Sequence, residues 1–435
     1  MTDLPGANLQ KAFADEMGRL LGPEFPKHLI LAVSGGGDSM AMLYLAAPWA
    51  RVMGITLYVC TVDHGLRPEA KDEASLVARA CKELGLYHQT LTWAWDGTGN
   101  VQEAAREARL DLINRWRGTV NHVLMAHTQD DQAETFLMRL ARGSGVDGLS
   151  AMAPSRQVPL GPTRTPLAQV PDGPPWPATM DGRMFLLRPL LAARRADLRH
   201  FLNVLKIEYA NDPSNEDPAY DRVKMRQAQP ALDALGLSVP RLAATAGRLT
   251  RAREVLERRA LEADALCRDG AVPLVSDVPF DRDAFAGIER ETQLRLLAAA
   301  LQFVGGEDRR PRLQALEGAL DRALAGGAST LHGGYVYPHG GTLYVCPEYA
   351  RVAETRPHNG LWRGYLRVGD IDVRALGEAG AAQLRDLTDL PARVLWPAPA
   401  VWDGDRVTGC PRIGFGTVWR PSVDATQYRR FLASH

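Results

Sequence analysis

The chain has 435 residues, of which 46% are hydrophobic and 23% charged, and its formal net charge is zero. At roughly 150 residues per domain, this length predicts about three domains, each able to fold around its own core. No apolar run approaches the roughly 20 residues of a membrane span, and the first residues do not resemble a signal peptide, so we expect a cytoplasmic protein without membrane contact. The five cysteines are odd in number and form no C-x-x-C pair, which disfavours disulfides and zinc sites.

Short apolar runs alternate with helical patterns through the first half of the chain. The runs that predict strands cover residues 28–33, 55–61, 87–93, 122–126 and 184–188. The patterns that predict helices cover residues 38–47, 69–85, 101–117, 129–142 and 194–205. Strands and helices that take turns are typical of α/β folds, so we predict an N-terminal parallel sheet with helices on both faces.

Two segments mark the end of the first predicted domain. A Pro-rich stretch at 154–177 has no clear periodicity and is interpreted as a long surface loop. Further along, turn-forming Asn, Asp, Pro and Ser residues fill the stretch 211–220. We therefore predict that the first domain covers residues 1–215.

Two further domains are predicted for the rest of the chain. Residues 216–349 are mostly helical in pattern and end in a predicted hairpin, whose strands at 330–337 and 342–346 flank a Gly-Gly pair. Residues 350–435 are rich in Pro, Gly and Trp and form a small third domain whose fold the pattern does not predict. The sequence leaves open whether the protein is a monomer or a homodimer.

The turn between the first predicted strand and the first predicted helix reads Ser34-Gly35-Gly36-Gly37-Asp38-Ser39. Glycines let the backbone approach a polyphosphate closely, and the N–H groups at a helix start attract anions. The two serine hydroxyls can add donors, and Asp38 fits beside phosphates if a Mg²⁺ ion bridges them. The turn is neither a Walker A loop nor a G-x-G-x-x-G fingerprint. A tight structural turn is the alternative, but the hexapeptide in this context favours phosphate binding.

Polar blocks also follow the second and fourth predicted strands, where side chains of a parallel sheet face a ligand crevice. The first block includes His64 and Arg67. The second block begins at His127 and contributes the acids Asp130, Asp131 and Glu134 within about one helical turn. Asp131 and Glu134 share a helix face because they are three residues apart. Acids in a first turn often only complement the helix dipole, but beside a phosphate loop they favour metal or amine binding.

The hexapeptide resembles the PP-loop of the N-type ATP pyrophosphatases, which bind the pyrophosphate of ATP and adenylate a carbonyl oxygen. The two polar blocks narrow the resemblance to the tRNA(Ile)-lysidine synthase family. Further matches are Arg142-Gly143-Ser144-Gly145, Arg188-Pro189-Leu190-Leu191 and the Asp-Pro-Ser-Asn-Glu-Asp run at 212–217 with Arg222 and Arg226 after it. The resemblance covers residues 28–226. The chain departs from the family pattern at Val223 and Leu110, where the family usually has Asn and Tyr.

The resemblance implies a two-step reaction that uses ATP, Mg²⁺, free L-lysine and an isoleucine tRNA with a CAU anticodon. The wobble cytidine is adenylated at its C2 oxygen with release of pyrophosphate, and the ε-amine of lysine then displaces AMP to give lysidine. Asp38, Asp131 and Glu134 are the expected catalytic residues, and Asp38 with Asp130 is the expected metal pair. The residues expected to bind ATP are Ser34, Gly35, Gly36, Gly37, Asp38, Ser39, His64 and Arg67. The residues expected to contact lysine or tRNA are Arg106, Arg109, His127, Asp131, Glu134, Arg222 and Arg226.

The segment 222–259 is locally basic, with nine Arg or Lys residues against three acids. Runs of charge are usually solvated helix faces, but an excess of this size in a neutral protein favours contacts with tRNA phosphates. Three other functions remain as alternatives. A 2-thiolation enzyme of the same superfamily would need reactive cysteines, an amidating enzyme would need an ammonia source, and a non-catalytic tRNA-binding protein would not need the intact acids.

Overall fold

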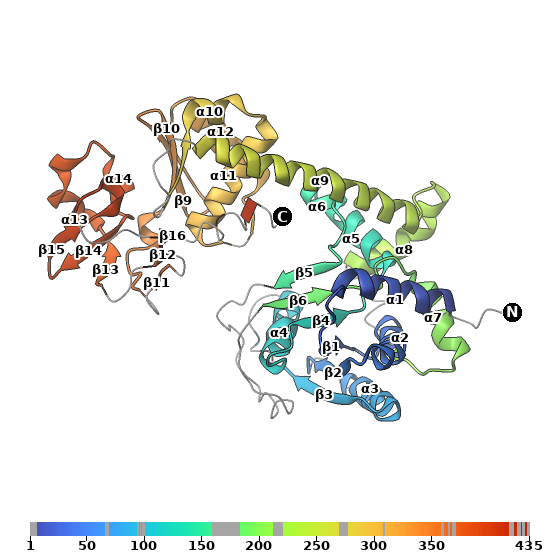
Figure 1. The fold of residues 1–435 in the computed structure, drawn as a ribbon. Helices are drawn as coiled ribbons and strands as arrows, with labels where there is room; N and C mark the ends of the chain where they lie inside the picture. The colour runs from blue at the N-terminus through green and yellow to red at the C-terminus, as the bar shows by residue number, and fades with distance from the viewer. Residues whose placement is uncertain are drawn as a thin grey trace. The chain divides into compact units, whose positions relative to one another are not determined.

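The computed structural model describes residues 7–65, 69–93, 95, 97, 101–158, 183–211, 221–268, 277–307, 309–357, 361–363, 366–367, 371–416, 422–423, 428 and 431–432. The chain forms two compact units, Met1–Thr250 and Arg251–His435. Figure 1 shows the first in blue to green and the second in yellow to red. The division into three domains at residues 215 and 350 stays a prediction. None of the described helices is long and apolar enough to cross a membrane.

The first unit is built on a six-stranded sheet with the order β3-β2-β1-β4-β6-β5 (Figure 1). The strands are β1 His28–Ala32, β2 Thr56–Asp63, β3 Tyr87–Thr92, β4 His122–Met125, β5 Ser155–Val158 and β6 Met184–Leu187. All neighbours pair in parallel except β5, which runs antiparallel to β6. The predicted parallel sheet is confirmed. The predicted loop at 154–177 is corrected at its start, because β5 forms an edge strand there, and its residues 159–177 lie outside the described part.

Helices cover both faces of this sheet, as predicted. They are α1 Ala7–Leu21, α2 Gly37–Met53, α3 Ala70–Leu84, α4 Val101–Trp116 and α7 Arg195–Val204. Two more helices, α5 Gln129–Ala141 and α6 Val146–Leu149, follow β4. Leu29 and Leu31 of β1 pack into one hydrophobic cluster with α1, α2, α3 and α7, whereas Ile30 packs into another with α4. Successive side chains of a strand point to opposite faces, so an uninterrupted apolar run is what a strand covered on both faces requires.

Two helices close the first unit and lead into the second. They are α8 Asp221–Ala234 and α9 Val239–Arg268. Ala133 and Phe136 of α5 share a small hydrophobic cluster with Val239, Leu242 and Ala246 of α9. The helix that carries the predicted acids is therefore packed on one side against the helices that carry the basic segment.

The second unit begins with an antiparallel sheet of order β7-β10-β9-β8. Its strands are β7 Val278–Asp281, β8 Ser329–Leu331, β9 Gly334–His339 and β10 Thr342–Pro347, and its helices are α10 Arg282–Gly287, α11 Arg290–Gly305 and α12 Leu313–Leu324. The predicted hairpin turn at Gly340-Gly341 is present. The predicted strand 330–337 was wrong in detail, because His332 and Gly333 turn with positive φ and split it into β8 and β9. Strand β7 also interrupts the region predicted as helical.

The C-terminal stretch has small elements of its own. The described strands are β11 Leu361–Trp362, β12 Leu366–Arg367, β13 Val373–Ala375, β14 Pro399–Asp403, β15 Arg406–Gly409 and β16 Ser422–Val423. The described helices are α13 Gly377–Gln383 and α14 Ala392–Leu395, with 3₁₀ turns at Tyr349–Arg351, Arg385–Leu387 and Pro411–Ile413. A hydrophobic cluster that includes Leu376, Leu384 and Val407 joins α13 to the β14-β15 pair. This is the fold that the sequence pattern did not predict.

Candidate active site

The predicted phosphate loop lies between β1 and α2 and has the backbone that such a loop needs. Gly35 has φ +89°, and a Cβ atom there would lie 3.2 Å from the carbonyl oxygen of Glu73, so only glycine fits. Ser39 Oγ accepts from the N–H of Ser34 at 3.1 Å and donates to the carbonyl of Gly36 at 2.9 Å. Gly36 caps α2 without a side-chain acceptor. The first N–H groups of α2 therefore have no capping side chain and suit an anion.

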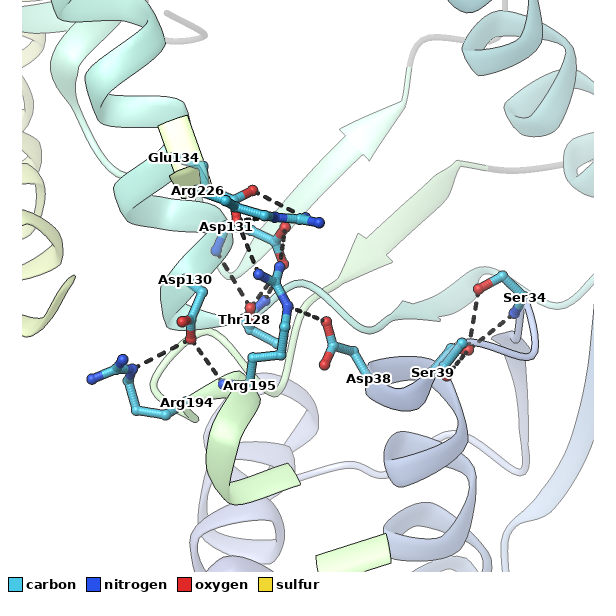
Figure 2. Close-up of polar contacts among 11 residues, drawn as sticks. Ser34, Asp38, Ser39, Thr128, Asp130, Asp131, Glu134, Arg194, Arg195 and Arg226 are labelled. Carbon is cyan, nitrogen blue, oxygen red and sulfur yellow. Dashed lines mark hydrogen bonds and ion pairs between the residues drawn. The ribbon is translucent and has the colours of Figure 1, made fainter. Parts of the chain in front are cut away.

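Asp38 stands in the first turn of α2 and faces the neighbouring helices (Figure 2). Its Oδ2 accepts from Nε of Arg195 at 3.0 Å, whereas its Oδ1 is buried and has no hydrogen-bond partner among the described residues. Burial raises the pKa of this carboxyl, and the charge of Arg195 offsets the rise only in part. A buried oxygen without a partner is costly unless a ligand satisfies it. Asp38 therefore fits the predicted role of a Mg²⁺ ligand.

Helix α5 begins with a capping box that fixes Asp131. Thr128 is the N-cap residue, and both its N–H and its hydroxyl donate to Oδ2 of Asp131, at 2.8 and 2.9 Å. The Thr128 hydroxyl also accepts from the N–H of Asp131. Asp131 is buried, which favours the protonated form, but Arg195 and the Thr128 N–H prevail and lower its pKa. Asp131 is thus an ionised group whose second oxygen, Oδ1, is directed at Arg195.

The centre of the site is Arg195, at the start of α7. No sequence pattern predicted a role for this residue. Its guanidinium contacts three carboxylates from two helices (Figure 2), namely Asp38 at 3.0 Å, Glu134 at 2.9 Å and Asp131 at 3.2 Å. Burial acts to lower the pKa of Arg195, but the three acids outweigh burial and raise it. Arg195 therefore remains charged. We call Asp38, Asp131, Glu134 and Arg195 the acidic pocket.

Asp130 is directed away from this pocket, toward the backbone of α7. Its Oδ2 accepts from the N–H of Arg195 at 2.8 Å and lies 3.4 Å from Nε of Arg194. Arg194 is the N-cap of α7 and offers no side-chain cap itself. Asp130 therefore caps α7 from the neighbouring helix. Its other oxygen has no partner among the described residues and is the one that would remain for a metal.

Glu134 has a second cationic partner. Nε of Arg226 donates to its Oε1 at 2.6 Å, and Nη2 of the same residue donates to Oε2 at 3.3 Å. Arg226 comes from α8, so the structure brings together two predicted residues that are 92 positions apart. Arg222, one turn earlier, is exposed and makes no bond with a described residue, although its charge acts on Asp131 and His127.

The two predicted histidines are neutral near neutral pH, and His127 interacts with Asp131 of the pocket. Burial lowers the pKa of His64 to about 4, with Arg109 adding to the effect and Asp63 opposing it. Nη2 of Arg109 is 3.3 Å from Nε2 of His64. Burial likewise lowers the pKa of His127 to about 4, and its buried Nδ1 has no hydrogen-bond partner in the described part of the chain. These rings suit hydrogen bonding with substrate more than charge pairing.

Two further predicted residues remain, Arg106 and Arg67. Arg106 is exposed on α4, and its charge contributes to lowering the pKa values of His127 and Arg109. Arg67 lies outside the described residues. Among the described residues, no three His, Cys, Asp or Glu side chains are arranged as ligands of one metal ion. Mg²⁺ is commonly held by one or two carboxylates together with substrate phosphates, so Asp38 alone or with Asp130 meets that pattern.

All five cysteines are buried and unpaired. Burial raises the pKa of both Cys60 and Cys81 to about 12, so neither thiol forms a thiolate near neutral pH. The structure thus gives the site no reactive sulfur from these residues. This agrees with the sequence argument against a thiolation enzyme.

The sheet, its glycine loop and the acids that face it define a class of ATP-binding protein. Residues 9–231, about half of the chain, match the family model described as PP-loop domain. The first unit is therefore a PP-loop domain, as the hexapeptide predicted.

Relatives narrow the class to a family. The tRNA(Ile)-lysidine synthase of Ruegeria pomeroyi is 40% identical over 425 residues, which are 94% of this chain and 95% of the relative. The enzyme of the same name from Bradyrhizobium sp. strain BTAi1 is 41% identical and covers 68% of this chain and 80% of its own. That from Wolbachia pipientis wMel is 31% identical and covers 76% and 73%. The chain belongs to the tRNA(Ile)-lysidine synthase family.

Similarity to solved structures is weaker. The U34-tRNA thiolase NcsA from Methanococcus maripaludis, with its [4Fe-4S] cluster, gives a TM-score of 0.41 at 15% identity over 55% of this chain and 78% of that chain. A likeness at this level carries no argument about function.

Proposed function

We propose that this protein is an ATP-dependent ligase that converts the wobble cytidine of a CAU-anticodon isoleucine tRNA into lysidine. The observation that carries the proposal is the acidic pocket beside the phosphate loop, in a chain 40% identical to a tRNA(Ile)-lysidine synthase along nearly its whole length. The phosphate loop would bind ATP, and the pocket would bind the cationic amine of free lysine.

The first step is adenylation. The C2 oxygen of the cytidine attacks the α-phosphorus, the bond to the β-phosphate breaks, and pyrophosphate leaves. The uncapped N–H groups of α2 and the Ser34 hydroxyl would hold the phosphates, and Ser39, which bonds Ser34 and Gly36, would hold the loop in shape. Mg²⁺, held by Asp38 with Asp130, would supply positive charge to the polyphosphate. His64, Arg67 and Arg109 are proposed to complete the ATP and substrate contacts.

The second step is lysine transfer. The lone pair of the neutral ε-amine forms the new bond to C2, and the C2–O bond breaks with its electron pair leaving on AMP. Oδ1 of Asp131 and Glu134 are the carboxylate oxygens placed to hold the incoming ammonium, because the capping box occupies the other oxygen of Asp131. The ammonium must give up a proton before attack, and these carboxylates are the acceptors nearest to it.

The RNA would lie against the basic residues of α8 and α9. Arg222, Lys224, Arg241 and Arg248 are exposed and belong to the first unit, together with the pocket. Phosphate contacts from such residues position an RNA without reading its sequence. His127 and Arg106 are proposed to contact the cytidine or its phosphate, since the charges of both Asp131 and Arg106 act on His127.

Lysine-dependent release of AMP is the experiment that tests the proposal. The protein is incubated with Mg²⁺, ATP and isoleucine tRNA carrying a CAU anticodon, and AMP is measured with and without L-lysine. We expect AMP release only when lysine is present, and mass spectrometry should locate lysidine at the wobble position. A response to ammonia or to a sulfur donor in place of lysine would contradict the proposal and favour an amidating or thiolating enzyme. The 2-thiolation alternative is not favoured, because the relatives are lysidine synthases and the cysteines are buried.

A further inference from the structure

Arg195 contacts residues that serve both halves of the proposed reaction. One guanidinium donates to Asp38, at the phosphate loop, and to Asp131 and Glu134, where lysine is proposed to bind (Figure 2). A lysine ammonium that takes Asp131 and Glu134 must therefore compete with a guanidinium already bound to them. The side chain of Arg195 is only 15% exposed, so this competition takes place where solvent screens charge weakly.

The two carboxylates of the lysine site keep other partners when Arg195 is set aside. Two hydrogen bonds from Thr128 hold Oδ2 of Asp131, and Arg226 holds Glu134 through two contacts. Loss of the Arg195 contacts would thus leave both groups in position and their charges available. Arg195 is therefore the cation of this network whose place a lysine ammonium can take.

The side chain of Arg195 can change its partners, but its backbone is held in place. Its backbone N–H donates to Asp130 at 2.8 Å, which fixes the start of α7. The Nε atom is one hydrogen bond away from Asp38, a residue of the phosphate loop itself. A planar guanidinium pairs with phosphate oxygens in a bidentate manner, so a polyphosphate on the loop offers Arg195 a strong alternative partner.

We propose that Arg195 is a positioning residue that makes lysine binding depend on bound ATP. The polyphosphate attracts the guanidinium away from Asp131 and Glu134 and thereby frees both carboxylates for the ε-ammonium. The inference rests on the proposed function, since it takes lysine as the ligand of this pair. By linkage, lysine must strengthen ATP binding by the same factor.

Calorimetric titration of the full chain with L-lysine tests this order. Affinity is measured with Mg²⁺ alone and with Mg²⁺ plus a non-hydrolysable ATP analogue. For the wild-type chain we expect lysine to bind about tenfold more tightly when the analogue is present, within the usual range of coupling between two sites. In Arg195→Met we expect tight lysine binding under both conditions, with a ratio near one. Arg195→Lys should keep part of the dependence because it keeps the charge.

Arg194→Met is the matched control, because Arg194 is the preceding arginine and the partner of its side chain among the described residues is Asp130, outside the acidic pocket. It should retain the wild-type ratio. A wild-type ratio of one, or an Arg195→Met variant that keeps the tenfold ratio or loses lysine binding, would overturn the inference. Thermal unfolding of each variant identifies misfolding. If Arg195→Met does not fold, the partly reduced ratio expected for Arg195→Lys tests the inference instead. If the wild-type chain binds no lysine and releases no lysine-dependent AMP, the proposed function fails as well. If it binds lysine and releases AMP but the ratio is one, only the present inference fails.

Discussion

The acidic side chains of this site differ in which of their carboxylate oxygens are available to a ligand. Oδ1 of Asp38 is buried and has no partner among the described residues, whereas the oxygens of Asp131 and Glu134 that face the pocket are already paired. The site therefore offers a metal one unsatisfied oxygen next to the phosphate loop. For an amine it offers Oδ1 of Asp131 and Oε1 of Glu134, and each of these oxygens must first lose its contact with Arg195.

Replacement of Asp38 tests the metal role at this scale. We expect Asp38→Ala to lower pyrophosphate release by about two orders of magnitude or more, since it removes a charged contact to the reacting phosphates. Binding of tRNA should be unchanged, which a filter-binding assay can check. Asp15→Ala, which removes an exposed acid on α1, is the control. Turnover close to wild type in Asp38→Ala would contradict the assigned role.

The residues of the site were predictable where a local pattern marks them. The glycines of the phosphate loop, the first-turn acids of α5 and the Arg222–Arg226 pair could all be read from short motifs. Arg195 could not, because its role arises from contacts with residues 61 to 157 positions away. One signal was present: it follows β6, and residues after parallel strands gather at the same sheet edge.

Helix α5 is the element on which the pocket depends, because its capping box both starts the helix and orients Asp131. Thr128→Ala removes the hydroxyl of the cap. We expect a loss of about 1–2 kcal/mol in the free energy of unfolding and weaker lysine binding, since Oδ2 of Asp131 loses one of its donors. Chemical denaturation and calorimetry measure the two effects. Thr128→Ser keeps the oxygen and should restore both, and a Ser variant as weak as Ala would show that the cap is not the cause.

Elements were predicted well where one periodicity dominates. The buried strands β1, β2 and β4 read as continuous apolar runs because helices cover both of their faces. Strand β5 was missed because it lies at the sheet edge, is largely exposed and has the sequence Ser-Arg-Gln-Val. The β8–β9 turn was missed because it uses a positive φ at His332, a conformation that histidine adopts uncommonly.

At the scale of the whole molecule, the buried histidines make the first unit sensitive to acid. Burial lowers the pKa of His64, His88 and His127 to about 4 in the folded chain, below the ordinary value near 6.5. The unfolded chain therefore binds more protons between these values, so stability falls as pH decreases from about 6.5 to about 4. We expect a slope of up to about 1.4 kcal/mol per pH unit for each histidine.

Thermal unfolding across this pH range measures the effect. His88→Gln should reduce the dependence of the unfolding free energy on pH by the contribution of one histidine. His88 is suited to this test because its side-chain partner is Thr61 and it lies outside the acidic pocket. Gln10→Ala, which changes a residue without a titrating group at an exposed position of α1, should leave the slope unchanged. Equal slopes in all three proteins would rule out this account.

Net neutrality of the chain also makes RNA binding a local property. Arg248 is exposed on α9, and we expect Arg248→Gln to weaken binding of every tRNA and to reduce the salt dependence of binding by about one phosphate contact. Arg51→Gln, at the exposed end of α2, has the same change of charge and should have little effect. Equal losses in both variants would assign the effect to overall charge. Salt titration of tRNA binding distinguishes these outcomes.

The cap that Asp130 provides to α7 predicts a genetic relationship within the chain. Asp130→Ala should loosen the start of α7 and displace Arg195, and it also removes one of the two proposed metal ligands. Arg194 occupies the N-cap position without capping its own helix. A serine or aspartate at that position could replace the missing acceptor. Arg194→Ser is therefore expected to suppress the loss of thermal stability in Asp130→Ala, whereas lysine-dependent AMP release stays low because the proposed metal ligand is still missing.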